Sequence, residues 1–139
     1  MTVSIMIITH EQVGNALLSA ATSVLGVLPL PTTVVAVGYD TDPDLLIPRL
    51  QKAAEDLEHG QGLLILTDLY GATPSNIALS FKNHSRIRII CGLNLPMLIR
   101  TMNYPTLDVD ALAERALTGG RDGVRQCEVK LESEICEIA

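Results

Sequence analysis

The sequence predicts one α/β domain built on a mainly parallel sheet. Short apolar runs rich in β-branched residues alternate along the chain with segments in which apolar residues recur every three or four positions, as in amphipathic helices. Hydrophobic residues make up 47% of the chain and aromatic residues only 3%. A core of Leu, Ile, Val and Ala suits a sheet with helices on both faces. A length of 139 residues supports one core, and we expect a single domain over residues 1–139.

Four apolar runs predict strands, and five segments predict helices. The strands are expected at residues 3–8, 32–39, 63–67 and 86–91. The helices are expected at residues 13–24, 41–57 and 73–81, after Pro96, and at 109–116. Pro48 cannot donate a backbone hydrogen bond, which predicts a kink or a late start in the second helix. Thr73 is expected to cap the third helix with Pro74 as its first residue, and Gly119 and Gly120 to close the last one.

The C-terminal segment has a different pattern. Residues 127–135 alternate apolar or small side chains with charged ones. This period of two predicts a half-exposed strand, either at an edge of the sheet or paired with another subunit.

Charge and motifs exclude several classes of protein. A net charge of −6 argues against a nucleic-acid groove, which needs clustered Lys and Arg. The chain contains no G-x-G-x-x-G, no G-x-x-x-x-G-K-[ST] and no G-x-S-x-G, so we expect no dinucleotide site, P-loop or serine-hydrolase elbow. Three cysteines without a CxxC motif, and a single well-placed histidine, predict neither a metal site nor a disulfide framework, and we expect no cofactor. No apolar run approaches the roughly 18 residues that span a bilayer, and no basic region precedes the first one, so we expect a cytoplasmic protein without a signal peptide.

The predicted strand order brings two functional side chains together. Parallel strands joined by crossover helices fit the flavodoxin-like order 2-1-3-4, in which the switch point lies between the first and third strands. His10 ends the first strand and Asp68 follows the third. Because open α/β sheets bind ligands at this point, we expect His10 and Asp68 to face each other there. His59 and His84 lack such neighbours and are expected in solvent.

An imidazole beside a carboxylate suits phosphoryl transfer. Asp68 is expected to hold one ring N–H of His10, which leaves the other nitrogen free to attack as a nucleophile. The hydroxyls of Thr9, Thr73 and Ser75, with the backbone N–H groups of the helix start behind Pro74, are expected to bind the phosphate.

Each of these features also has an ordinary structural explanation. A histidine at a strand end can be a hydrogen-bonded structural residue, and a Thr-Pro-Ser helix start can be only a cap. Asp68 can simply close a turn. The case for function depends on all three features meeting at the predicted switch point.

The chain resembles the IIA domains of the mannose-type sugar phosphotransferase system over residues 2–124. The resemblance is carried by the strand that ends in Thr9-His10, by residues 68–76 (DLYGATPSN) and by residues 92–98 (GLNLPML), and residues 119–124 (GGRDGV) also resemble the family's closing segment. Three separated motifs in the right order are more specific than any one of them.

The resemblance implies a phosphoryl carrier. It implies that His10 receives a phosphoryl group from the carrier protein HPr, that Asp68 orients His10 and that Thr73 lies near the phosphate. The acceptor would be a IIB domain that passes the group to a sugar during transport, so any membrane contact would be indirect, through a transporter complex. The family also implies a homodimer, in some members with an exchanged C-terminal strand.

The chain departs from the family pattern at two positions, and two alternative functions remain open. Glu11 stands where a small residue is common and adds negative charge beside His10, and Tyr70 stands where some members carry Trp. The sequence shows no linker and no IIB domain, so the acceptor is expected to be another chain. The alternatives are the phosphotransfer subunit of dihydroxyacetone kinase and a regulatory binding module whose partner senses phosphorylation of His10.

Overall fold

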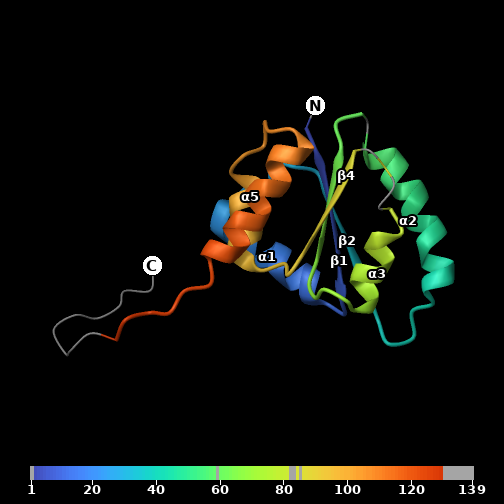
Figure 1. Cartoon of the computed structure of the whole chain (residues 1–139), viewed down its shortest axis with the longest axis horizontal. Helices are drawn as coiled ribbons and strands as arrows, with labels where there is room; N and C mark the ends of the chain where they lie inside the picture. Colours follow the sequence, from blue (N-terminus) through green and yellow to red (C-terminus); the bar gives the residue numbers. More distant parts are fainter. Residues whose placement is uncertain (1, 59, 82–83, 85, 130–139) are drawn as a thin grey trace.

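The protein is a doubly wound α/β domain around a four-stranded parallel sheet in the order β2-β1-β3-β4 (Figure 1). The computed structural model describes residues 2–58, 60–81, 84 and 86–129. The strands are β1 (Ser4–His10), β2 (Thr32–Val37), β3 (Leu63–Thr67) and β4 (Ile87–Cys91). The helices are α1 (Val13–Leu25), α2 (Pro43–Glu58), α3 (Thr73–Leu79), α4 (Leu95–Met102) and α5 (Val109–Asp122). The predicted fold class and strand order are confirmed.

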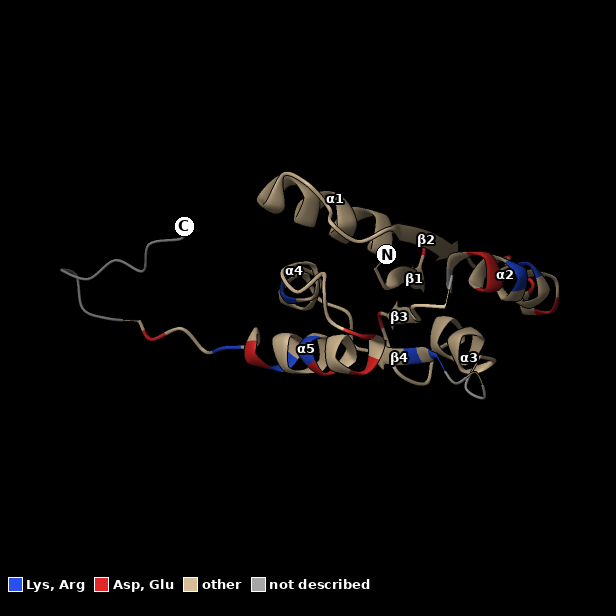
Figure 2. Cartoon of the chain, turned by 90° about the horizontal axis from the view of Figure 1, so that it is seen from above, with Lys and Arg blue, Asp and Glu red and all other residues tan. Residues whose placement is uncertain are grey.

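The two central strands are buried on both faces. Successive side chains of a strand point to opposite sides, so β1 contributes Ile5 and Ile7 to one core and Met6 and Ile8 to the other. The first core packs against α1, α4 and α5, and the second packs against α2 and α3. Figure 2 shows these two groups of helices on either side of the sheet. The unbroken apolar sequence of β1 follows from this double burial.

Helix α2 is continuous from Pro43 through Glu58, with Pro48 inside it. The prediction of a late start was therefore wrong. Pro48 lies in the second turn, where its missing N–H costs the helix one hydrogen bond, to the carbonyl of Asp44. Leu50 and Ala54, on the buried side of the same helix, pack into the second core and hold it against the sheet.

Two glycines that were expected to end the last helix lie inside it. Helix α5 runs through Gly119 and Gly120 to Asp122. A Cβ at Gly119 would lie 2.5 Å from Cβ of Arg100, and one at Gly120 would lie 2.7 Å from Cε of Met97. These glycines therefore allow α4 and α5 to pack closely, and the helix continues beyond them to Asp122.

The start of α3 also differs from the prediction. The residue at the N-cap is Ala72, and no side chain caps the helix. Thr73 is the first helical residue, and it is exposed. Asn94 and Asp108 do cap α4 and α5, since their side chains accept hydrogen bonds from the backbone N–H groups of Met97 and Ala111.

The predicted C-terminal strand lies mostly outside the described residues. Within it, residues 127–129 are exposed and form no strand. The rest of the segment, from residue 130, is not described.

Candidate functional site

The site lies at the carboxyl ends of β1 and β3, which are neighbours in the sheet. The last paired residues of these two strands are Ile8 and Thr67. His10 ends β1, and Asp68 follows β3 directly, so both side chains emerge at the same edge. This arrangement follows from the parallel order, because β1 and β3 flank the switch point.

His10 and Asp68 are joined by two hydrogen bonds to one oxygen. Oδ2 of Asp68 lies 2.9 Å from Nδ1 of His10 and accepts a second hydrogen bond, of 3.0 Å, from the backbone N–H of His10. A carboxylate can only accept, so Nδ1 carries the ring proton. Nε2 is then the nitrogen with the free lone pair. The His10 side chain is 44% exposed and the Asp68 side chain 14%, so the carboxylate is held in the protein while the ring reaches the surface.

The second oxygen of Asp68 is buried. Oδ1 has no hydrogen-bond partner within the described part of the chain. Buried polar atoms without partners are uncommon in folded proteins, and a catalytic role is one explanation for them. The carboxylate is thus held through Oδ2 alone, by the residue that it orients.

His10 opens onto a cavity of about 480 Å³. It is lined by the β1–α1 turn, the loop after β2 and the start of α3: His10, Glu11, Val37, Gly38, Tyr39, Thr41, Pro43 and Thr73. The residues after β2 were not predicted as part of the site. The order 2-1-3-4 contains the information needed to find them, because β2 pairs with β1 and its following loop must border His10.

Of the three hydroxyls expected at the phosphate, one faces the cavity. Thr73 is exposed and lines it. Thr9 is fully buried, and its Oγ1 accepts a 2.7 Å hydrogen bond from the backbone N–H of Gly14. Ser75 is also fully buried and donates to the carbonyl of Ala72 at 2.8 Å. The geometry therefore gives Thr9 and Ser75 structural roles at the starts of α1 and α3 in place of the expected phosphate contact.

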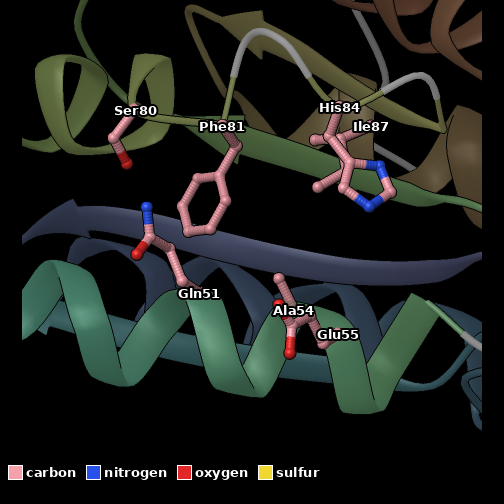
Figure 3. A pocket seen from close by; sticks show the side chains of 7 residues that line it. All are labelled: Gln51, Ala54, Glu55, Ser80, Phe81, His84 and Ile87. Carbon is pink, nitrogen blue, oxygen red and sulfur yellow. The ribbon is translucent and has the colours of Figure 1, made fainter.

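A second cavity, of about 410 Å³, lies at the opposite end of the sheet. It is lined by residues of α2, by the end of α3 and by Ile87, the first residue of β4 (Figure 3). His84 borders it and is exposed, as expected, and its Nδ1 accepts a hydrogen bond from the backbone N–H of Arg86. No carboxylate bonded to His84 repeats the pairing seen at His10 within the described residues. His59, the third histidine, lies outside the described residues.

Two further properties concern only the residues that the structure describes. No group of three or more His, Cys, Asp or Glu residues there could hold a metal ion. No helix among them is both long enough and apolar enough to cross a bilayer.

The fold and the site together define a flavodoxin-like α/β protein with an accessible histidine, oriented by a carboxylate, at its switch point. The family model for the PTS system fructose IIA component, EIIA-man, matches residues 4–117, and the chain belongs to this family. The match covers all four strands, His10 and Asp68.

Individual proteins agree with this assignment. The chain is 30% identical over 135 residues to the PTS system mannose-specific EIIAB component of Escherichia coli K12, an alignment that covers 94% of this chain and 41% of that protein. The structure of the EIIA component from Streptococcus agalactiae has 26% identity and a TM-score of 0.75, and covers 89% of this chain and 96% of its own. The mannose/sorbose-specific IIA subunit from Enterococcus faecalis shares the fold, with 23% identity, a TM-score of 0.81 and coverage of 94% and 98%.

These relatives support a phosphocarrier role in the sugar phosphotransferase system. The chain spans less than half the length of the EIIAB relative.

Proposed function

We propose that this chain is a protein-histidine phosphotransferase that accepts a phosphoryl group on Nε2 of His10. The observation that carries the proposal is the 2.9 Å hydrogen bond between Nδ1 of His10 and Oδ2 of Asp68. The His10 ring is also partly exposed and lines a cavity. This bond assigns the proton to Nδ1 and leaves the lone pair of Nε2 available to an incoming group.

The proposed step exchanges one P–N bond for another. Nε2 of His10 attacks the phosphorus of a phosphohistidine on the donor protein. The donor's P–N bond breaks, and the donor imidazole leaves with the electron pair. The ring of His10, which keeps its proton on Nδ1, becomes a phosphorylated imidazolium facing Asp68. A carboxylate in this position stabilises the positive charge and holds the ring in the reactive tautomer. Thr73, which lines the same cavity, is the hydroxyl that we propose contacts the phosphoryl group.

The proposed donor is HPr, and the proposed acceptor is a IIB component; in a regulatory role, phospho-His10 would itself be the output. Membership of the EIIA-man family and the similarity to an EIIAB protein support both proposed partners. A relay with HPr would place the chain in the cytoplasm.

We further propose a homodimer, since Val124 and Val129, after α5, are 78% and 99% exposed and are available to a second copy. Light scattering of the purified chain measures this assembly, and a monomer at all concentrations would refute it.

The test is phosphorylation of the purified chain by phosphoenolpyruvate, enzyme I and HPr. We expect an adduct that is labile in acid and stable in base, as a phosphohistidine is. His10→Ala should abolish the adduct, whereas the matched control His84→Ala, at an exposed histidine, should leave it unchanged. Labelling that persists in His10→Ala would refute the assignment. Transfer to a dihydroxyacetone kinase and to no IIB protein would assign the chain to that other pathway.

A further inference from the structure

Glu11, the residue after His10, has an unusual backbone conformation. Its φ is +44°, and it is the one non-glycine residue with positive φ in the part of the chain that is described. This left-handed region is disfavoured for residues with a Cβ and is open to glycine without penalty. Glutamate is therefore a poor choice for the backbone at this position.

This conformation lies in the short connection between β1 and α1, which is held by hydrogen bonds on both sides of Glu11. The Glu11 N–H donates to the carbonyl of Val37 at 3.0 Å, which keeps this residue at the edge of the sheet. Two residues later α1 begins, fixed by the hydrogen bond from Gly14 to Thr9. Because glycine would adopt this conformation more readily, the presence of glutamate points to a role for its side chain. An inference from a backbone outlier to function is justified in this direction.

The Glu11 carboxylate lies on the His10 cavity. Glu11 lines the cavity together with His10, and its Oε1 lies 3.7 Å from the position that a Cβ on Gly38 would take, beside the end of β2. Its carboxylate forms no ion pair with any described residue. The negative charge is therefore not neutralised by a neighbour.

Among the described residues, the cavity beside His10 has carboxylates at or near it and no Lys or Arg in its lining. No Lys or Arg is among the residues that line the cavity. Asp68 is bonded to the ring, and Oδ1 of Asp40 lies 3.3 Å from the same point above Gly38. A phosphoryl group on Nε2, which carries one to two negative charges, would share the cavity with Glu11, and no described Lys or Arg lines that cavity.

We propose that Glu11 destabilises phospho-His10 by charge repulsion and so makes this chain a stronger phosphoryl donor to its acceptor. The inference rests on the proposed function, since it presumes that His10 is phosphorylated. The reaction is the exchange already described, in which one P–N bond forms on Nε2 as the donor's P–N bond breaks. Glu11 changes the free energy of the phosphorylated side of this equilibrium, and it takes no part in bond making.

The experiment measures the equilibrium constant for phosphoryl exchange between HPr and this chain. The phosphorylated and unphosphorylated forms of both proteins are quantified by intact mass after mixing. Glu11→Gln removes the charge and keeps the size of the side chain. At low salt we expect its equilibrium constant to shift toward the phosphorylated chain by roughly three- to tenfold. This is the size of the repulsion between two like charges that are separated by solvent within one cavity. The shift should shrink at about 1 M salt, where screening is nearly complete.

Three further variants distinguish the effect of the Glu11 charge from the effects of backbone strain and of the total net charge. Glu11→Asp should behave as the wild type, because it keeps the charge. Glu11→Gly should show the same shift as Glu11→Gln and should also raise the thermal stability, because glycine relieves the strain. Glu114→Gln, at an exposed position on α5, changes the net charge equally and should leave the equilibrium unchanged.

The possible failures are distinguishable. A wild-type chain that HPr does not phosphorylate refutes the proposed function. If the wild type is phosphorylated and the equilibrium of Glu11→Gln is unchanged, Glu11 has no effect on phospho-His10 and the inference is wrong. A shift in Glu11→Gly alone would assign the effect to the backbone. A changed rate of exchange with an unchanged equilibrium would make Glu11 a docking residue for HPr, which also overturns the inference.

Discussion

Replacing Asp68 by Asn is the sharpest test of how the site works. In the wild type, Oδ2 accepts hydrogen bonds from the backbone N–H and from Nδ1 of His10. Asparagine can retain an oxygen at the Oδ2 position, but it then places an NH₂ group where Oδ1 is buried without a partner. The variant therefore keeps the shape of the site while it removes the negative charge and adds an unsatisfied donor.

The size of the effect follows from the two bonds separately. A hydrogen bond to a charged group is worth about 1.5–3 kcal/mol and a neutral one about 0.5–1.5 kcal/mol, so each bond is weakened by roughly 1–1.5 kcal/mol. The backbone bond is present before and after transfer, and its weakening lowers the free energy of unfolding. The ring bond strengthens as the imidazolium forms, and its weakening slows phosphorylation by about tenfold. An amide that holds the wrong tautomer would slow the reaction further.

The assay is rapid-quench transfer from phospho-HPr, with circular dichroism to confirm that the variant is folded. Asp110→Asn is the matched control, because Asp110 pairs with Arg88 on the exposed surface of the same protein. We expect Asp68→Asn to slow transfer and Asp110→Asn to leave it unchanged. Wild-type transfer by folded Asp68→Asn would show that the carboxylate is only structural and would refute the reasoning about tautomer and charge.

Two further predictions concern the start of α1. Thr9→Val should lower the free energy of unfolding by about 1–3 kcal/mol, because it leaves the buried N–H of Gly14 without its acceptor, while the phosphorylation rate of the folded variant stays the same. A large loss of phosphorylation without a loss of stability would return Thr9 to the phosphate site. Gly14→Ala should cost about 1–3 kcal/mol in chemical denaturation, because its Cβ would lie 2.7 Å from Cγ2 of Ile7 and 2.9 Å from Oγ1 of Thr9. A variant as stable as the wild type would mean that α1 can move away from the sheet.

The fold was predictable because the sequence pattern and the burial agree. The apolar run of β1 is buried on both faces, as a central parallel strand must be, and the crossover helices fix the parallel order. The order alone brought His10 and Asp68 together. Helix ends were harder, since a glycine that closes a helix and a glycine that permits close packing look alike in sequence. Gly119 and Gly120 belong to the second kind, and only the neighbouring α4 distinguishes them.

The details of the site could not be read from residue types. A hydroxyl near a strand end can face the ligand or bond to the backbone, and the sequence does not contain the direction in which it points. Thr9 and Ser75 are buried, whereas Thr73 is exposed. The backbone conformation of Glu11 was equally hidden, because it results from the length of the connection between β1 and α1 and from the bond to Val37.

The oxygen shared by the ring and the backbone of His10 has a mechanical consequence. The pairing of β1 with β3 ends at Ile8 and Thr67, and Oδ2 of Asp68 then accepts the N–H of His10 in the place of a main-chain carbonyl. A side-chain atom thus accepts the hydrogen bond that follows the last paired residues of the two central strands. A change in the charge of the imidazole changes the strength of the hydrogen bond between the ring and Oδ2. It should therefore also change the strength of the hydrogen bond that Oδ2 accepts from the His10 backbone. We therefore expect the rate of hydrogen exchange at the His10 amide to change when the His10 ring is phosphorylated.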